Sequence, residues 1–454
     1  MKTYLFSGYE LTGIPIVLLS VYFISKTSWR LLPVYLIFAF QFLRGVIEYA
    51  NLLSFNIVNF ISELLVLFLL FRLFVNIKRI PKVLKPIIIL YLVSFFSYLL
   101  NDSSFLEYIL FLRRISVIFF MIIYFKESYY GKENILLEQF LVLLVLYQPI
   151  VSVIKLLFYG VAEVFIGTMS IGEGSITTNF GLIAIAYSLI YYLKKLDNKY
   201  LFAGGAFLVF IISGGKRAPL LYIPLLAFFI IFIYLKKFKN VNIISFNKLI
   251  MVSLFLLFSL IAILFYDSTL NPDTSTGIDL EHAENYIIDY VTEEGKDDVI
   301  GYGRAVAPRA IYDRLYDSGA SKVLTGLGPG ILIPSSLKPS EFGTDKEIFI
   351  NQYGIGYGGR IGFLYIIFQI GVLGCILFVW FFINQFKSLY SKLLYFNNNS
   401  KLMFEFLLGL SCLFIFFLDF FSYSQVMFKI NAASFLFAYI IGTRNNSFFL
   451  KTFN

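Results

Sequence analysis

The chain has 454 residues, of which 59% are hydrophobic and only 14% are charged, and its formal net charge is +9. Soluble domains carry about 45–50% apolar and about 25% charged residues, so this composition excludes a cytosolic globular enzyme and a disordered chain. It indicates a polytopic membrane protein.

Two cysteines and one histidine exclude further kinds of site. Cys375 and Cys412 both lie inside apolar runs, so we expect no disulfide in an exterior domain. His282 stands near Glu281 and Glu284 without further ligands, and an exposed helix face is the better interpretation. We therefore predict neither a metal nor another cofactor.

Apolar runs that could cross a bilayer recur along the chain. A spanning helix needs about 20 mainly apolar residues. The runs predict an all-α, polytopic integral membrane protein with about thirteen spanning helices. They lie at 9–25, 31–49, 57–77, 83–100, 105–125, 135–159, 177–193, 200–213, 218–235, 249–266, 357–385, 402–422 and 425–441. The first run lacks a basic start and a cleavage site, so we expect it to remain a span.

Lys and Arg in the short loops predict the orientation. Alternate loops collect most of these cations, whereas the opposite loops hold Asp102, Glu163 and Glu173. The basic loops face the cytoplasm if the N-terminus lies outside and the C-terminus inside. The cations of these loops are Lys26, Arg30, Lys78, Arg79, Lys82, Lys85, Lys126, Lys132, Lys194, Lys195, Lys199, Lys236, Lys237, Lys239, Lys248, Lys387, Lys392, Lys401, Arg444 and Lys451.

One long polar segment divides the chain into three parts. Residues 1–266 and 357–454 hold the predicted spans, and 267–356 form a large extracytoplasmic loop with 15 acidic and seven basic residues. The first third of the loop is acidic, and glycine-rich segments follow at 326–330 (GLGPG) and 354–362 (GIGYGGRIG). The loop therefore changes character along its length.

A helix is predicted in the loop at residues 303–319. Pro308 suits its first turn, Ile311 and Leu315 fall on one face, and Gly319 suits its end.

The loop arginines are Arg304, Arg309 and Arg314. Arg309 and Asp313 are spaced for an i,i+4 ion pair. A solvated helix face explains these arginines unless other cations meet them at a ligand.

The turn SGGKRAP (213–219) places two cations on the exterior side, against the positive-inside tendency. Gly214 and Gly215 would let backbone amides approach a ligand, and Lys216 with Arg217 suits a phosphate or diphosphate. The alternative is a basic pair at a hairpin tip that extends toward water.

Two arginines fall near the middle of the 105–125 run. Arg113 and Arg114 lie about 12–14 Å from either end of that run. Such charges need a partner or a wet cavity. The alternative to a ligand is an internal ion pair with Glu48 or Glu63.

Other charges also lie inside predicted spans. Arg44 and Glu48 are spaced for a local pair, and Lys155 is a further intramembrane cation. Asp419 has no partner on its own helical face, so it is either a general base or the ion-pair partner of Lys429. Together these charges suggest an outward-facing polar cavity for an anionic ligand.

Three motifs then occur in a meaningful order. ISGGKRAPLL (212–221) precedes the large loop, Gly-Arg (303–304) with GLGPG (326–330) follows within it, and FQIGVLGCI (368–376) opens the next span. In these motifs the chain resembles the O-antigen ligase/polymerase superfamily of bacterial membrane glycosyltransferases, most closely the Wzy-type repeat-unit polymerases.

The resemblance implies inverting, metal-independent transfer between undecaprenyl-diphosphate-linked glycans, as donor and acceptor, at the exterior face of the bacterial cytoplasmic membrane. A chain-length regulator and a flippase are the implied protein partners, and no nucleic acid is expected. By motif position, Arg217 and Arg304 would hold the donor diphosphate. The catalytic candidates are thus Arg217, Arg304 and Asp419, and the substrate-binding candidates are Gly214, Gly215, Lys216, Arg114, Arg309, Arg314 and Arg360.

One departure from the family pattern concerns the general base. Ligase-type members carry His-Asn about eleven residues before the glycine of the third motif, where this chain has Arg360-Ile361. Two alternatives stay open: a ligase that transfers the glycan to another acceptor, and a flippase for the same lipid. A flippase is expected to show two similar halves and short exterior loops, unlike this chain.

Overall fold

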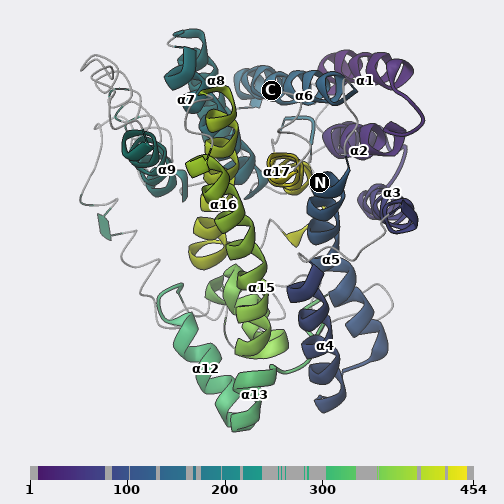
Figure 1. Ribbon diagram of the computed structural model, residues 1–454, viewed down its shortest axis with the longest axis vertical. Helices are drawn as coiled ribbons and strands as arrows, with labels where there is room; N and C mark the ends of the chain where they lie inside the picture. The colour runs from purple at the N-terminus through teal and green to yellow at the C-terminus, as the bar shows by residue number, and fades with distance from the viewer. Residues whose placement is uncertain are drawn as a thin grey trace.

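A computed structural model describes residues 9–76, 84–101, 103–128, 133–159, 167–169, 175–195, 197–214, 218–237, 303–333, 355, 357–395, 400–424 and 428–446, with isolated residues between 254 and 285. Its regular elements in these ranges are helices (Figure 1). A helix occupies every predicted run except 249–266, of which only single residues are described.

The helices before the large loop are α1 (Tyr9–Lys26), α2 (Leu32–Tyr49), α3 (Phe55–Asn76), α4 (Lys85–Leu100), α5 (Phe105–Glu127), α6 (Glu133–Tyr159), α7 (Ser175–Lys195), α8 (Lys199–Ser213) and α9 (Ala218–Lys237). The loop contributes α12 (Ala307–Asp317) and α13 (Ala320–Thr325). The 3₁₀ helix η3 (Tyr357–Arg360), α15 (Gly362–Tyr395), α16 (Ser400–Ser422) and α17 (Ala432–Asn445) follow.

Seven helices of the described ranges are long and apolar enough to cross a membrane, and four shorter apolar helices accompany them. The chain therefore has the composition and the helices of a polytopic membrane protein. The last predicted run, 425–441, begins too early. Asn431 caps α17 by accepting a hydrogen bond from the Ser434 amide at 2.9 Å, so the helix starts at Ala432.

The C-terminal helices lie at the centre of the molecule (Figure 1). α16 contacts α7 and α9 on one side and α15 and α17 on the other, while α5 packs on α17 and α4 packs on α15. Phenylalanines fill the contact between α15 and α16: the Phe382 and Phe416 ring centroids are 4.0 Å apart, and those of Phe378 and Phe420 are 5.4 Å apart. Part of the large aromatic content thus serves core packing.

α15 is a broken helix. Ile370 (φ −127°) and Gly371 (φ +71°) have non-helical backbone angles, so a short first segment precedes a long second one. A break frees carbonyls that a regular helix would pair with amides four residues later. In an apolar environment such groups need other partners.

The GLGPG segment (326–330) supplies those partners. The Leu327 amide donates to the Phe368 carbonyl at 2.9 Å, and the Gly328 amide donates to the Gln369 carbonyl at 3.1 Å. The Gln369 side chain also accepts from the Gly330 amide at 3.0 Å. The second and third motifs, about 40 residues apart in sequence, therefore pack directly on each other.

The predicted loop helix is present as α12, although it begins at Ala307 rather than at residue 303, and the short helix α13 was not predicted. α12 has Pro308 in its first turn and buries Ile311 and Leu315. α13 reaches the α4–α5 corner, where the Lys322 ammonium donates to the Leu100 carbonyl at 2.9 Å and the Asn101 side-chain oxygen at 2.6 Å. The segment 303–333 of the loop is thereby attached to both α15 and α4.

Replacing Gly371 by Ala is expected to lower the apparent melting temperature in detergent and to loosen the loop. A non-glycine residue in this extended, positive-φ conformation costs about 1–3 kcal/mol, and the added Cβ would meet the Leu324 carbonyl. The matched control is Gly205→Ala in α8, where an added Cβ meets nothing within 4 Å and helix propensity improves by about 1 kcal/mol. Equal melting temperatures for both variants would contradict the role of the break.

Candidate functional site

Asp419 lies at the end of α16 and is almost fully buried, at 1% exposure. The Ser424 hydroxyl donates to one carboxylate oxygen at 2.7 Å. The backbone amides of Tyr423 and Ser424 both donate to the Asp419 carbonyl at 2.9 Å, which closes the helix with a tight turn. This turn fixes the direction of the carboxylate.

Two neighbouring helices add polar groups beside Asp419. Tyr222 of α9 is 3% exposed, and its hydroxyl lies 2.6 Å from the Ser422 hydroxyl. Asn179 of α7 lies beside the carboxyl group of Asp419 and is fully buried. Among the described residues, neither atom of the Asn179 amide meets a partner at good hydrogen-bonding geometry. A buried amide with this spare capacity is suited to a ligand or water.

Arg304 brings the loop to the same place. Its guanidinium carbon is 4.5 Å from the centroid of the Tyr423 ring, and its charge acts on both Asp419 and Tyr222. Arg304 comes directly before α12, so the attachment of the loop to α15 determines where it lies. We call Asp419, Ser424, Tyr222, Tyr423, Asn179 and Arg304 the Asp419 site.

Two glycines at helix ends allow close packing of neighbouring helices. A Cβ at Gly362, the first residue of α15, would lie 2.8 Å from the Phe420 ring and 2.9 Å from the Ser424 carbonyl. Arg360 precedes this contact by two residues and is half-buried. Gly214, at the end of α8, packs on the Thr177 side chain near the start of α7.

The loop arginines separate into two groups. Arg304 belongs to the site, whereas Arg309 is 87% exposed at its side chain, 3.8 Å from Asp313, as the spacing predicted. Arg314 is exposed on the same helix. Gly215, Lys216 and Arg217 lie outside the described residues, so their predicted roles stay predictions.

The two adjacent arginines of α5 also separate. Arg113 forms an ion pair with Glu63 at 2.5 Å, which confirms the internal-pair alternative for this residue. Arg114 donates to the Tyr365 hydroxyl at 2.8 Å and lies 5.0 Å from its ring centroid. Since Tyr365 belongs to the first segment of α15, Arg114 supports that segment.

Other buried charges meet backbone groups in the interior. Arg44 donates to the Ile430 carbonyl at 3.2 Å. The Lys155 ammonium donates to the Gly167 carbonyl at 2.6 Å. The charge of Arg304 acts on Asp419, and the alternative in which Asp419 pairs with Lys429 stays a prediction.

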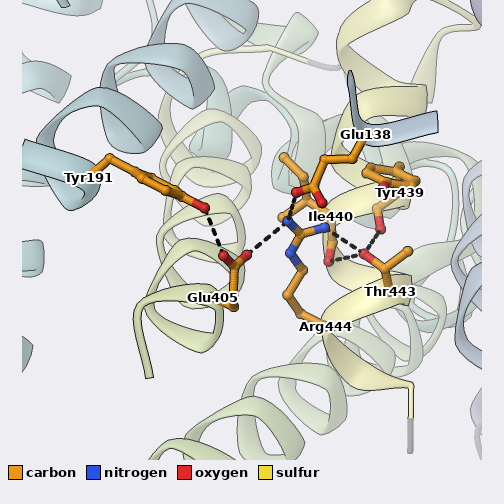
Figure 2. A network of polar contacts seen from close by, with 7 residues as sticks. All are labelled: Glu138, Tyr191, Glu405, Tyr439, Ile440, Thr443 and Arg444. Atoms are coloured by element: carbon orange, nitrogen blue, oxygen red, sulfur yellow. Dashed lines mark hydrogen bonds and ion pairs between the residues drawn. The ribbon is translucent and has the colours of Figure 1, made fainter. Parts of the chain in front are cut away.

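A second polar group lies near the other end of α16 (Figure 2). The Arg444 guanidinium donates to Glu405 at 2.9 Å and to Glu138 at 3.1 Å, and the Tyr191 hydroxyl donates to Glu405 at 2.8 Å. Arg444 was predicted in the loop after the last span, but it lies in the last turn of α17 and is 2% exposed. We call these four residues the Arg444 network.

Sequence reasoning missed Asn179, Tyr222, Tyr423 and Ser424. Each is a common polar or aromatic residue in or beside an apolar helix, and no spacing connects them. The only available signal was that Tyr423 and Ser424 directly follow the helix that carries Asp419.

The comparisons with known proteins add no family. No family model matches the chain, and no curated protein matches it. The resemblance to the ligase/polymerase superfamily therefore depends on the three motifs alone.

Replacing Glu405 by Leu is expected to cost up to about 3–5 kcal/mol, because the buried Arg444 guanidinium then keeps only Glu138, whose side chain is 42% exposed. The apparent melting temperature in detergent should fall clearly. The control is Asp313→Asn on α12, whose exposed pair resembles surface pairs that contribute about 0–1 kcal/mol. A Glu405 variant as stable as the control would show that the Arg444 network does not stabilise the fold.

Proposed function

We propose that this protein is a membrane glycosyltransferase that polymerises oligosaccharide repeat units carried on undecaprenyl diphosphate. The observation that carries the proposal is the position of Arg304 over Tyr423, where its charge acts on the buried Asp419. A cation that can hold an anionic leaving group thus lies beside a carboxylate that can accept a proton.

The reaction divides between these groups. The bond between the anomeric carbon and the diphosphate oxygen breaks, and its electron pair leaves with the lipid diphosphate, whose charge Arg304 stabilises. An acceptor hydroxyl attacks the anomeric carbon from the opposite side and forms the new glycosidic bond. Its proton passes to Asp419, which Ser424 orients.

Further residues have supporting roles in this proposal. Arg360, Lys216 and Arg217 bind the diphosphate, and Gly214 and Gly215 allow it close approach. Tyr423, which is partly exposed, provides an aromatic surface for a sugar ring, and the buried Tyr222 ring supports it at a centroid distance of 6.3 Å. Arg309 and Arg314 are exposed on α12, so they meet the glycan outside the reacting centre.

The proposed topology follows the basic loops. The Asp419 site faces the exterior of the bacterial cytoplasmic membrane, the N-terminus lies outside, and the C-terminus lies in the cytoplasm. About thirteen spans and one large exterior loop complete this arrangement.

Replacing Arg304 by Ala should abolish chain extension and leave single-repeat, lipid-linked product. Loss of one charge-stabilising group costs about 10²–10³ in rate, and Arg304→Lys should recover part of it. The control is Lys387→Ala, an exposed cation far along α15 from Gly362. The measurement is the glycan ladder of cells that depend on each variant.

The same ladder separates the alternatives. Finished polymer with an undecorated acceptor would indicate a ligase, and repeats held at the inner leaflet would indicate a flippase. A normal ladder in the Arg304→Ala cells would contradict the proposed role of this residue.

Asp419→Asn tests the base separately. The amide oxygen can still accept from Ser424, so the fold should remain, while loss of the proton acceptor should slow transfer by about 10²–10⁴. Single-turnover transfer with purified protein and saturating lipid-linked repeats measures this step. An unchanged rate would exclude Asp419 as the base.

A further inference from the structure

An apolar pocket lies far from the Asp419 site, among α6, α7, α8, α16 and α17. Its volume is about 440 Å³, within the range of about 300–1,000 Å³ that is usual for ligand pockets. Glu405 and Asp419 are 14 residues apart on α16, or about 21 Å. The pocket, which adjoins Arg444, therefore belongs to the other end of the bundle.

The pocket runs along its helices. Glu138 and Leu146 of α6 both line it, and so do Lys199 and Phe207 of α8. Each pair spans eight residues, or about 12 Å. Leu146 is 43% exposed, so the pocket reaches the outer apolar surface of α6. Its walls are therefore shaped for an elongated apolar chain that enters from the side.

Its polar end combines cations with stacked tyrosines. The Tyr187 and Tyr191 ring centroids are 4.3 Å apart, and those of Tyr191 and Tyr200 are 5.6 Å apart. Lys195 and Lys199 each lie 5.6 Å from the centroid of the Tyr200 ring. Tyrosines and lysines together are typical of the depth where lipid head groups meet helix ends.

Basic residues outnumber acidic residues at this end of the pocket. Arg444 is compensated by Glu405 and Glu138. Lys194 and Lys195 end α7, and Lys199 pairs with Asp197 at 2.7 Å while remaining 66% exposed. The three lysines outnumber Asp197 and the second carboxylate beside Arg444, and Lys195 and Lys199 lie at the Tyr200 ring, so an anion beside these two lysines is favoured.

We propose that this pocket holds one acyl chain of an anionic phospholipid of the bilayer, with its phosphate at Lys195 and Lys199. The apolar walls of the pocket contact the acyl chain, and the lysines at its rim bind the phosphate. This site is separate from the proposed transferase reaction and does not depend on it.

Native mass spectrometry of the purified chain with phosphatidylglycerol and phosphatidylcholine of equal chain length tests the proposal. We expect phosphatidylglycerol to bind at least tenfold more tightly. Ala203→Phe fills the pocket and should weaken binding at least tenfold. The matched control is Gly205→Phe on the same helix, where an added Cβ meets nothing within 4 Å, and it should bind as the parent does.

The double variant Lys195→Gln with Lys199→Gln tests the rim. Its affinities for the two lipids should differ by no more than about twofold, since each Lys near an anionic surface contributes modestly to binding. If Ala203→Phe does not fold, a photoactivatable phosphatidylglycerol on the unaltered chain should label peptides of α6 and α8. The proposal would be overturned if both lipids bound equally or if Ala203→Phe bound as the parent does. It would also be overturned by labelling of other peptides, or by displacement of phosphatidylglycerol by undecaprenyl phosphate at equal concentration.

Discussion

The arrangement of this molecule depends on the backbone pairing at the break in α15. Gly371 interrupts the helix, and the amides of Leu327 and Gly328 bind the carbonyls of Phe368 and Gln369. Unpaired carbonyls inside an apolar bundle cost several kcal/mol each. The break and the GLGPG segment therefore require each other, and an otherwise polar loop is held to the bundle by hydrogen bonds that leave side chains free for other roles.

This attachment also determines the position of Arg304, which precedes α12. It fixes α12 and α13, and Arg304 directly before them lies over Tyr423 beside Asp419. A loop cation would otherwise be a solvated charge of little effect.

α16 carries two polar groups of different character: the Asp419 site, where buried polar capacity remains, and the Arg444 network, where Glu405 and Glu138 compensate the guanidinium (Figure 2). The first is suited to a ligand, and the second to holding helices together.

Much of the secondary structure could be predicted from the sequence because local signals determine it. Apolar runs gave the helices, and Pro308 with Ile311 and Leu315 gave α12 and its buried face. An internal ion pair with Glu48 or Glu63 was one of two explanations for the charge of Arg113 in an apolar run, and the structure shows the pair with Glu63. The burial of Arg444 was not predicted, because hydropathy treats any cation near a helix end as solvated, whereas Glu405 and Glu138 on other helices compensate this one.

The sequence by itself determined that the chain is a helical membrane protein, where most of its helices lie, and that Asp419 is an unusual charge in its setting, whereas Arg304 looked like an ordinary loop cation. Only the tertiary structure decided that these two meet, that Tyr222 and Asn179 join them, and that GLGPG fills the break in α15. The physical reason is the sequence separation over which each interaction acts. Helix formation and burial follow from neighbours within a few residues, whereas the Asp419 site joins groups more than 100 residues apart that only packing can bring together.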